Sequence, residues 1–535
     1  MRHLTRIACL GLVVFLLTSI SIVRAADCPR MLGCGVSGCA CGDTVTADFT
    51  MNMNITCPQT FNDPTFGLVV NPGVTLNGLD PTTGQIHKII GPGNPDANHP
   101  ISPLQPHSDN VGIWLHSNGG TPSTVLNVEV SGFERGLQID AGSNGNTLQN
   151  VATHDNGNFL NGNAHGYGID VLGSDNIIDG CQVYHNADEG IHFSSSEDDG
   201  SIAPHGICSE SSAACTRDGD CPSGQTCVVA NGARNTVKST VNGASQVYDN
   251  GRENLYVRIT SATKITDTTS SFPGRCACSQ ASDCGTGGAC GTTAVWGARC
   301  IKGAATACTT SADCASGHAC LHGSSVSLTA YIKHSVDGIY RRDTFTDAGI
   351  QLVGNSRDNI FGRPDVTAGG VTLTNADLKF NEHPDDGGYP SGNRVRYSTI
   401  TNPAGPCVQF RNSSVNTLDH VTYSCGGSWS IQTNGLCALN PEKDCGANGN
   451  DCVEQCDGGM CETSGSSCMS NSGCGCVAGH CDINPSVTCS TGNDCHLCDA
   501  LLPQGPNEVC DTTLPTYSPA APAPASLVLN GATCP

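Results

Sequence analysis

The stretch Gly168-Ile169-Asp170-Val171 is repeated shortly afterwards as Gly190-Ile191-His192-Phe193, and it is preceded by Gly136-Leu137-Gln138-Ile139. In each copy a glycine is followed by an apolar, a polar and an apolar residue, and a polar corner containing Asn lies a few residues upstream. Ile169 and Ile191 are 22 residues apart, a period that is typical of solenoids. The triplet also recurs further along the chain, as Leu255-Tyr256-Val257, Gly349-Ile350-Gln351-Leu352, Val408-Gln409-Phe410 and Ile431-Gln432.

Two further registers accompany this strand. Asn156, Asn186 and Asn250 align at one corner, and a third strand begins each repeat just after another asparagine, as at Asn146, Asn176, Asn235 and Asn393. Asparagine suits tight corners because it tolerates left-handed backbone and bonds its neighbours, and stacked copies can form an amide ladder. Three short strands per rung predict an all-β fold, a right-handed parallel β-helix in which each rung buries its apolar face against the next.

The opening rungs resemble those of a known superfamily. Cys41-Gly42-Asp43-Thr44-Val45, Asn54-Ile55-Thr56-Cys57 and Val74-Thr75-Leu76-Asn77-Gly78 are similar to the first rungs of secreted right-handed parallel β-helix proteins, the pectin-lyase-like superfamily. The resemblance covers roughly residues 41 to 435 outside the insertions. It implies the fold, but it does not select a function, because the superfamily includes lyases, hydrolases, alginate-modifying enzymes, phage tailspikes and adhesins.

The organisation of the chain follows from composition shifts. Arg2 and Arg6 precede an apolar run from Ile7 to Val23, and Val23-Arg24-Ala25 resembles a cleavage site, which predicts a signal peptide over 1–25; an uncleaved anchor is the alternative. We expect an N-terminal cap and first rungs over 26–100, the helix over 101–435, a Cys-rich module over 437–498 and a Pro/Ala-rich tail over 499–535. No later segment has the 18 consecutive apolar residues of a membrane span, so the protein is expected to be secreted or held at the cell surface.

The cysteines predict disulfides. Of 35 cysteines, 34 remain once Cys9 is removed with the signal, and even-numbered groups lie in the insertions 208–227 and 276–320 and in the 437–498 module. Dense cysteines in an exported chain favour disulfides over zinc, although Cys495-His496-Leu497-Cys498 has the spacing of metal ligands. We expect the three groups to leave the rod at one common corner.

Net charge limits the partners. A formal charge of −23 argues against nucleic acid and anionic membranes. No cofactor is expected; Ca²⁺ is the ion that the acidic pairs Asp188-Glu189 and Asp385-Asp386 would suit, and solvated turn carboxylates are the simpler interpretation. The sequence leaves the oligomeric state open.

The polar residues of the aligned strands should form an outward lane, because strand side chains alternate faces. Asp170 and His192 fall on neighbouring rungs about 5 Å apart, where the carboxylate would orient the imidazole for acid–base work. With Asp188 and Glu189 nearby, these four are the candidate catalytic residues. The candidate ligand-binding residues on the lane are Gln138, Tyr256, Gln351 and Gln409.

Two functions remain open. Arg258-Ile259-Thr260 lacks the lysine of the polygalacturonase Arg-Ile-Lys, no Gly-His-Gly occurs, and the cations Arg252, Arg258 and Arg341-Arg342 look scattered. These absences favour a structural or adhesive protein that binds extracellular polysaccharide on an exposed strand face. The alternative is a polysaccharide-modifying lyase, epimerase or glycoside hydrolase, which would require Asp170, His192 and a cation to converge.

Overall fold

The computed structural model describes most of the rod. The described residues run from 39 to 437, without 58–65, 92–109, 117–120, 161–162, 196–205, 209–213, 216–226, 230–231, 241–242, 274, 285–288, 292–298, 303–305, 307, 309–310, 315–317, 319, 322–326, 363–368, 382–388, 412, 428–429 and 433–435, followed by short strands between 456 and 499, by 507–510 and by 527–529. The expected signal peptide and most of the expected tail lie outside them. Among the described residues, no helix has the length and apolar character needed to cross a membrane.

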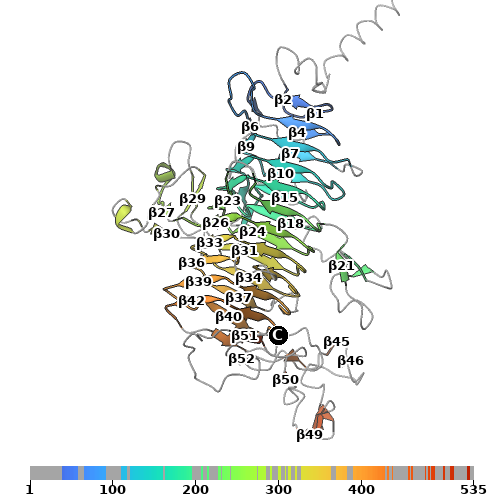
Figure 1. Cartoon of the computed structure of the whole chain (residues 1–535), viewed down its shortest axis with the longest axis vertical. Coiled ribbons are helices and arrows are strands. Elements are labelled where there is room, and N and C mark those ends of the chain that lie inside the picture. The colour runs from blue at the N-terminus through green and yellow to red at the C-terminus, as the bar shows by residue number, and fades with distance from the viewer. Residues whose placement is uncertain are drawn as a thin grey trace, which may run out of the picture.

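Three parallel sheets wind around one axis (Figure 1), and successive strands of the chain pass from sheet A to sheet B to sheet C. Sheet A contains β1 (Asp43–Val45), β4 (Phe66–Val70), β7 (Val111–Leu115), β10 (Arg135–Ile139), β15 (Ile169–Val171), β18 (Ile191–Ser194), β24 (Glu253–Arg258), β31 (Leu328–Lys333), β34 (Ile350–Val353), β37 (Leu378–Asn381), β40 (Val408–Arg411) and β43 (Ser430–Gln432).

Sheet B contains β2 (Phe49–Thr50), β5 (Thr75–Asn77), β8 (Thr124–Leu126), β11 (Thr147–Gln149), β16 (Ile177–Asp179), β22 (Thr236–Lys238), β25 (Lys264–Thr266), β32 (Ile339–Arg341), β35 (Ile360–Phe361), β38 (Arg394–Arg396), β41 (Thr417–Asp419), β51 (Asn507–Cys510) and β52 (Leu527–Leu529). Sheet C contains β3 (Ile55–Thr56), β6 (Lys88–Ile90), β9 (Glu129–Ser131), β12 (Ala152–His154), β17 (Gln182–Tyr184), β23 (Ser245–Tyr248), β26 (Thr268–Ser271), β33 (Thr344–Thr346), β36 (Thr372–Thr374), β39 (Thr399–Asn402) and β42 (Thr422–Cys425).

Small antiparallel elements lie outside the three sheets. They are β13 (Asn158–Leu160) with β14 (Asn163–His165), β19 (Gly206–Cys208) with β20 (Ala214–Cys215) and β21 (Cys227–Val229), β27 (Arg275–Cys276) with β30 (Cys320–Leu321), β28 (Ala289–Gly291) with β29 (Arg299–Lys302), β44 (Leu436–Cys437) with β50 (Cys498–Asp499), β45 (Cys456–Asp457) with β46 (Met460–Cys461), and β47 (Cys476–Val477) with β48 (His480–Cys481) and β49 (Asn484–Thr488); two 3-10 turns are η3 (Ala281–Cys284) and η4 (Ser311–Asp313). The fold is therefore the predicted right-handed parallel β-helix, all-β with insertions.

The pairing of neighbouring strands in sheet A places most of the predicted polar lane correctly, and it corrects the lane at two strands. Asp170 pairs His192, which pairs Tyr256. Tyr331 then stands between Tyr256 and Gln351 on β31, a strand that lacks the glycine pattern. At the far end the prediction for Gln432 is wrong, because Gln432 pairs Arg411, two residues beyond Gln409, and Ser430 continues the lane from Gln409.

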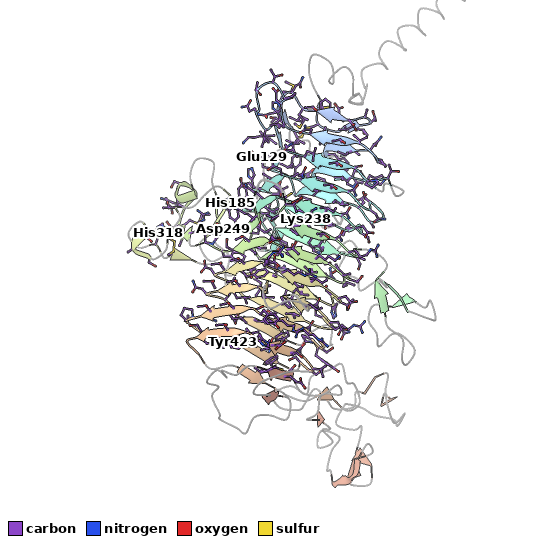
Figure 2. The ribbon with its side chains drawn as sticks, in the orientation of Figure 1. Glu129, His185, Lys238, Asp249, His318 and Tyr423 are labelled. Carbon is purple, nitrogen blue, oxygen red and sulfur yellow. A yellow bond between two sulfur atoms is a disulfide. The ribbon has the colours of Figure 1, made fainter. Side chains whose placement is uncertain are left out.

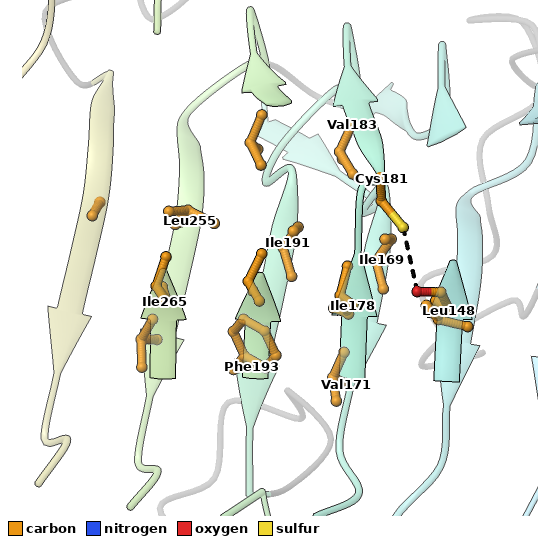
Figure 3. Close-up of a cluster of buried hydrophobic side chains, with 14 of the residues drawn as sticks. Leu148, Ile169, Val171, Ile178, Cys181, Val183, Ile191, Phe193, Leu255 and Ile265 are labelled. Atoms are coloured by element: carbon orange, nitrogen blue, oxygen red, sulfur yellow. Dashed lines mark hydrogen bonds between the residues drawn. The ribbon is translucent and has the colours of Figure 1, made fainter. Parts of the chain in front are cut away.

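The interior is a stack of apolar side chains. Ile178, Ile191 and Leu255 are fully buried, as are most inward residues of every rung (Figure 3). Burying each such side chain contributes about 1.5–3 kcal/mol. The thiol of Cys181 lies in this core, unbridged and 3.7 Å from the carbonyl oxygen of Leu148.

Amide ladders fix two corners, and the sequence predicted the one that contains Asn156, Asn186 and Asn250. Asn156 Nδ2 donates to Asn186 Oδ1 at 2.9 Å, and Asn186 Nδ2 donates to Asn250 Oδ1 at 2.8 Å. The ladder satisfies buried amides that would each cost about 1–3 kcal/mol if left unpaired. The other predicted asparagines form similar chains at a second corner, Asn146–Asn176–Asn235 and Asn359–Asn393–Asn416–Asn507.

Disulfides staple the rod and one insertion. Cys41–Cys57 brackets the turn β1–β2–β3, and Cys407–Cys425 brackets β40–β41–β42. The insertion after β26 holds three more bridges, Cys276–Cys314, Cys278–Cys290 and Cys308–Cys320, so disulfides rather than zinc occupy these cysteines. Cys495 to His496 lie outside the described residues.

The insertions do not share one corner. The segments after β18 and β43 leave between sheets A and B, whereas the segment after β26 leaves between sheets C and A. Figure 1 shows β21 and the β27–β30 group on opposite sides of the rod. The expectation of a common corner is wrong because β25 and β26 intervene between the Tyr256 strand and the second insertion.

Candidate functional site

Buried polar side chains gather on the outward side of sheet A, from β10 to β31. The outward face of a solenoid is normally solvated, yet His192 is 1%, Asp170 2% and Glu189 2% exposed. Taking charges out of water costs several kcal/mol per ion unless they are paired. This region, which we call the sheet A cluster, is therefore unlike the rest of the lane, where Gln351 and Gln409 are half-buried.

His192 is held by a carboxylate and a guanidinium in series. Its Nδ1 lies 3.0 Å from Asp170 Oδ1, and Arg135 Nη1 lies 3.4 Å from the other carboxylate oxygen, Oδ2. The other ring nitrogen, Nε2, is buried and makes no hydrogen bond within the described chain. A carboxylate on Nδ1 fixes the tautomer that leaves Nε2 as the acceptor.

Aromatic rings enclose the imidazole on the neighbouring rungs. The Tyr167 ring stacks at 4.6 Å and the Tyr256 ring lies at 5.2 Å from His192, centroid to centroid. Tyr331 continues the row at 5.3 Å from Tyr256. Burial raises the pKa of Tyr256 well above its usual value, and the nearby Arg258 opposes this only in part. Tyr256 therefore carries its proton at neutral pH.

Three carboxyl groups surround Arg252 at the corner before β18 and β24. The guanidinium lies 2.9 Å from Glu253, 3.2 Å from Glu189 and 3.5 Å from Asp188. One guanidinium does not balance three carboxylates. Burial raises the pKa of Glu253 to about 7, with Arg252 lowering it and Asp188 raising it. The group therefore holds a shareable proton near neutral pH.

The same carboxyl groups have the arrangement of a cation site. One oxygen each from Asp188, Glu189 and Glu253 lies within 4.8 Å of the others, and carboxylate oxygens are the ligands that Ca²⁺ prefers. Arg252 supplies a positive charge at this place, and its side chain is 38% exposed, so it has room to move away from the carboxylates.

A basic pair borders the tyrosines. Arg258 and Lys333 are direct partners on β24 and β31, two residues beyond the paired Tyr256 and Tyr331. Strand spacing puts the Cα atoms of the two residues about 5 Å apart on one outward lane. The expectation that cations are scattered is wrong for this site, because Arg135, Arg252 and Arg258 all lie on or beside the sheet A cluster.

The structure brings the four predicted catalytic residues into this region. Asp170 and His192 are hydrogen bonded, and Asp188 and Glu189 meet at Arg252. Of the candidate ligand-binding residues, Gln138 and Tyr256 lie in or beside the cluster. Gln351 and Gln409 lie two and four strands beyond Tyr256 in sheet A, and Gln409 donates to Asp377.

Sequence reasoning missed several members of the cluster. Arg135, Tyr167 and Glu253 each stand one residue before the pattern glycine or its replacement Asn254, the same position that Glu189 occupies. Aligning that position across rungs would have grouped them. Tyr331 carries no glycine signal, and a long insertion separates it from Tyr256.

A second cluster lies on sheet C. His154, Tyr184 and Tyr248 stack at 4.7 and 5.0 Å. His154 bonds Asp155 and Glu129, and Figure 2 shows Glu129, His185 and Asp249 along this side of the rod. Burial lowers the pKa of His154, but the two carboxylates outweigh it and raise the pKa overall. Every ring nitrogen of His154 is bonded, so this cluster serves packing.

Comparison with solved structures finds weak likenesses. The A-module of the mannuronan C-5 epimerase AlgE6 of Azotobacter vinelandii is 11% identical, with a TM-score of 0.28, over 74% of this chain and 80% of that one. The AlgE4 A-module of the same organism gives 11%, 0.28, 74% and 79%. The tailspike protein 2 of Escherichia coli O157:H7 bacteriophage CAB120 gives 10%, 0.26, 75% and 38%. No protein-family model and no curated protein matches the sequence. The assignment as a parallel β-helix rests on the three sheets of this chain.

Proposed function

We propose that this protein is a polysaccharide-modifying enzyme that abstracts a proton from an acidic sugar ring, with its active centre in the sheet A cluster. The observation that carries the proposal is His192, which is buried, oriented by Asp170 and left with an unbonded Nε2. Keeping a buried nitrogen without a partner costs about 1–3 kcal/mol. Other buried polar atoms of the described chain also lack a partner, among them His87 Nε2, but His192 combines this with a carboxylate on its other ring nitrogen and a place on the polar lane of sheet A.

His192 is the base in this proposal. Asp170 holds the Nδ1 proton, so Nε2 offers a lone pair to the acidic C–H beside the sugar carboxylate. Tyr256 on the next rung keeps its phenol proton and is the acid, delivering it to the leaving glycosidic oxygen in a β-elimination or to the opposite face of the ring carbon in an epimerisation. Acid–base groups of this kind contribute about 10²–10⁴-fold each.

Arg258 and Lys333 are the groups that would neutralise the sugar carboxylate. Proton removal from its α-carbon spreads negative charge onto that carboxylate, and cations placed there stabilise it. The pair also offsets the −23 charge of the chain for an anionic substrate. Ca²⁺ held by Asp188, Glu189 and Glu253 would be a second source of positive charge. Comparing turnover with Ca²⁺ and with a chelator tests this role.

The protein acts outside the cytoplasm in this proposal. Support comes from the disulfides of the described chain, because such bridges persist in oxidising compartments, and from the apolar N-terminal run. Polysaccharide binding without turnover is the second candidate, favoured by the outward row of Tyr256 and Tyr331.

The test is turnover on a panel of polyuronates, with Ca²⁺ or with a chelator. Unsaturated-uronate absorbance reports elimination, and deuterium incorporation from heavy water, seen by NMR, reports epimerisation. His192→Ala and Tyr256→Phe should each lose about 10²–10⁴-fold.

The matched control is His420→Ala, which removes a mostly exposed histidine bonded to Asp419 and should leave turnover unchanged. Binding on a glycan array without turnover would contradict the enzyme proposal and support an adhesive protein that binds polysaccharide. If the His192→Ala variant kept its turnover, the active centre could not lie at His192.

A further inference from the structure

We infer that Arg135 is a positioning residue for His192, acting through Asp170 and Tyr167 at once. The inference deepens the proposed function and rests on it for its kinetic consequences, whereas its structural consequence, the tautomer of His192, can be measured without substrate. Arg135 stands at the start of β10, two strands from His192 in sheet A.

The first path runs through one carboxylate. Asp170 uses Oδ1 for His192 Nδ1 at 3.0 Å and Oδ2 for Arg135 Nη1 at 3.4 Å. At 2% exposure Asp170 is out of water, and a buried carboxylate requires a cation nearby. Without Arg135 the carboxyl group would lose the cation that holds Oδ2, and a carboxyl group that turned away would release the Nδ1 proton of His192.

The second path runs through a ring. The Arg135 guanidinium carbon lies 5.7 Å from the Tyr167 ring centroid, within the range of a cation–π contact. Tyr167 in turn stacks on His192 at 4.6 Å. Arg135 therefore braces both the hydrogen-bond partner and the stacking partner of the same imidazole, a convergence that a general surface ion pair would not produce.

Arg135 is itself held in place. Its Nη1 donates to Gln138 Oε1 at 3.0 Å, and Gln138 Nε2 donates to Asp140 Oδ1 at 3.0 Å. His116 completes the chain at 2.7 Å from the other oxygen of Asp140. Both ends of the Gln138 amide are engaged and the residue is 6% exposed, so Gln138 braces the guanidinium.

The experiment compares the full chain with Arg135→Gln, Arg135→Lys and a control, Arg234→Gln. Arg234 forms a comparable ion pair with Asp175, but on an exposed surface of sheet B. Proteins labelled with ¹⁵N-histidine are compared by NMR, with His192→Ala identifying the His192 signals. Wild type, control and Arg135→Lys should show the proton on Nδ1, and Arg135→Gln should show mixed tautomers.

Kinetics add a second readout. Arg135→Gln should lower kcat by about 10²-fold, the loss expected when a reacting group is misplaced by about 1 Å. KM should stay unchanged, because in this inference Arg135 acts through Asp170 and Tyr167 and not on the substrate. Arg135→Lys or added guanidinium should restore part of kcat. If Arg135 had only a structural role, Arg135→Gln would lower the stability of the fold. It would not change the tautomer of His192, and neither Arg135→Lys nor added guanidinium would restore kcat.

The outcomes separate the two claims. An altered tautomer with no turnover in any form of the protein sustains the role of Arg135 and overturns the proposed enzyme. An unaltered Nδ1 tautomer in Arg135→Gln overturns the inference, whether or not the protein is an enzyme. If Arg135→Gln does not fold, Arg135→Lys is compared with wild type instead. If Arg135→Lys had the kcat of wild type and the same response to added guanidinium, the inference would be overturned.

Discussion

Glu253→Gln should stabilise the protein in a pH-dependent manner. Burial next to Asp188 raises the pKa of Glu253 from 4.5 to about 7, so the folded chain holds a proton that the unfolded chain releases between those values. Native stability therefore falls across this window as pH rises. A shift of about 2–3 units corresponds to about 3 kcal/mol, at about 1.4 kcal/mol per unit.

Glutamine cannot ionise, so the variant escapes this loss. The two proteins should have equal stability below about pH 4, and the variant should be more stable by about 3 kcal/mol above about pH 7. Urea unfolding followed by circular dichroism, from about pH 4 to about pH 9, measures the difference.

Glu129→Gln gives a control of opposite sign. Burial raises the pKa of Glu129, but hydrogen bonds from Lys88 and His154 outweigh it and lower the pKa overall, so this carboxylate stabilises the fold once ionised and its removal should cost stability above about pH 4. A Glu253→Gln difference that stays constant with pH, or that favours wild type at high pH, would refute the electrostatic reasoning about the Arg252 group.

Three further perturbations test the fold. Asn186→Ala should lower the free energy of unfolding by about 1–3 kcal/mol, because it leaves the amides of Asn156 and Asn250 short of partners; Asn375→Ala, which removes an exposed amide, should cost less in the same urea titration, and equal losses would contradict the ladder. Burial raises the pKa of the Cys181 thiol to about 12, so mass spectrometry after N-ethylmaleimide treatment should find Cys181 unmodified in the native protein and modified after denaturation; native labelling would show that the core opens. Replacing Cys407 and Cys425 together by serine should destabilise by about 3 kcal/mol, as expected for a loop of this size, and an unchanged midpoint would mean that the bridge constrains nothing in the unfolded chain.

The repeat made the fold readable from sequence. In a solenoid every rung solves the same packing problem, so Ile169 and Ile191, or Asn156 and Asn186, carry the same signal at a fixed spacing. The pairing of Asp170 with His192 followed from that register. Gln432 was misplaced because its strand is shifted by two residues relative to the pattern, and a shift of two residues keeps a side chain on the same face but moves it to the next lane.

Burial and charge pairing at the site could not be read in this way. Arg135, Arg252 and Glu253 matter because of what surrounds them in three dimensions, and their partners Asp170 and Glu189 lie on other rungs. The pairing of Arg258 with Lys333 crosses an insertion longer than two repeats, so no local spacing reveals it. Likewise, the corner at which an insertion leaves the rod depends on how many strands of that rung precede it. The insertion after β26 follows two more strands than the insertion after β18, so it leaves on the opposite side of the rod.

The two staples at the ends of the rod have a mechanical consequence. In this fold the sheet hydrogen bonds run along the rod axis, so tension applied to the two ends would peel rungs away singly, beginning with the outermost coil that has a neighbour on one side only. Cys41–Cys57 and Cys407–Cys425 close the first turn and the last turn that contains all three sheets. They lie where unravelling and proteolytic attack would start, so the rod can be pulled or nicked beyond its ends while the rungs of the sheet A cluster, between the staples, stay wound.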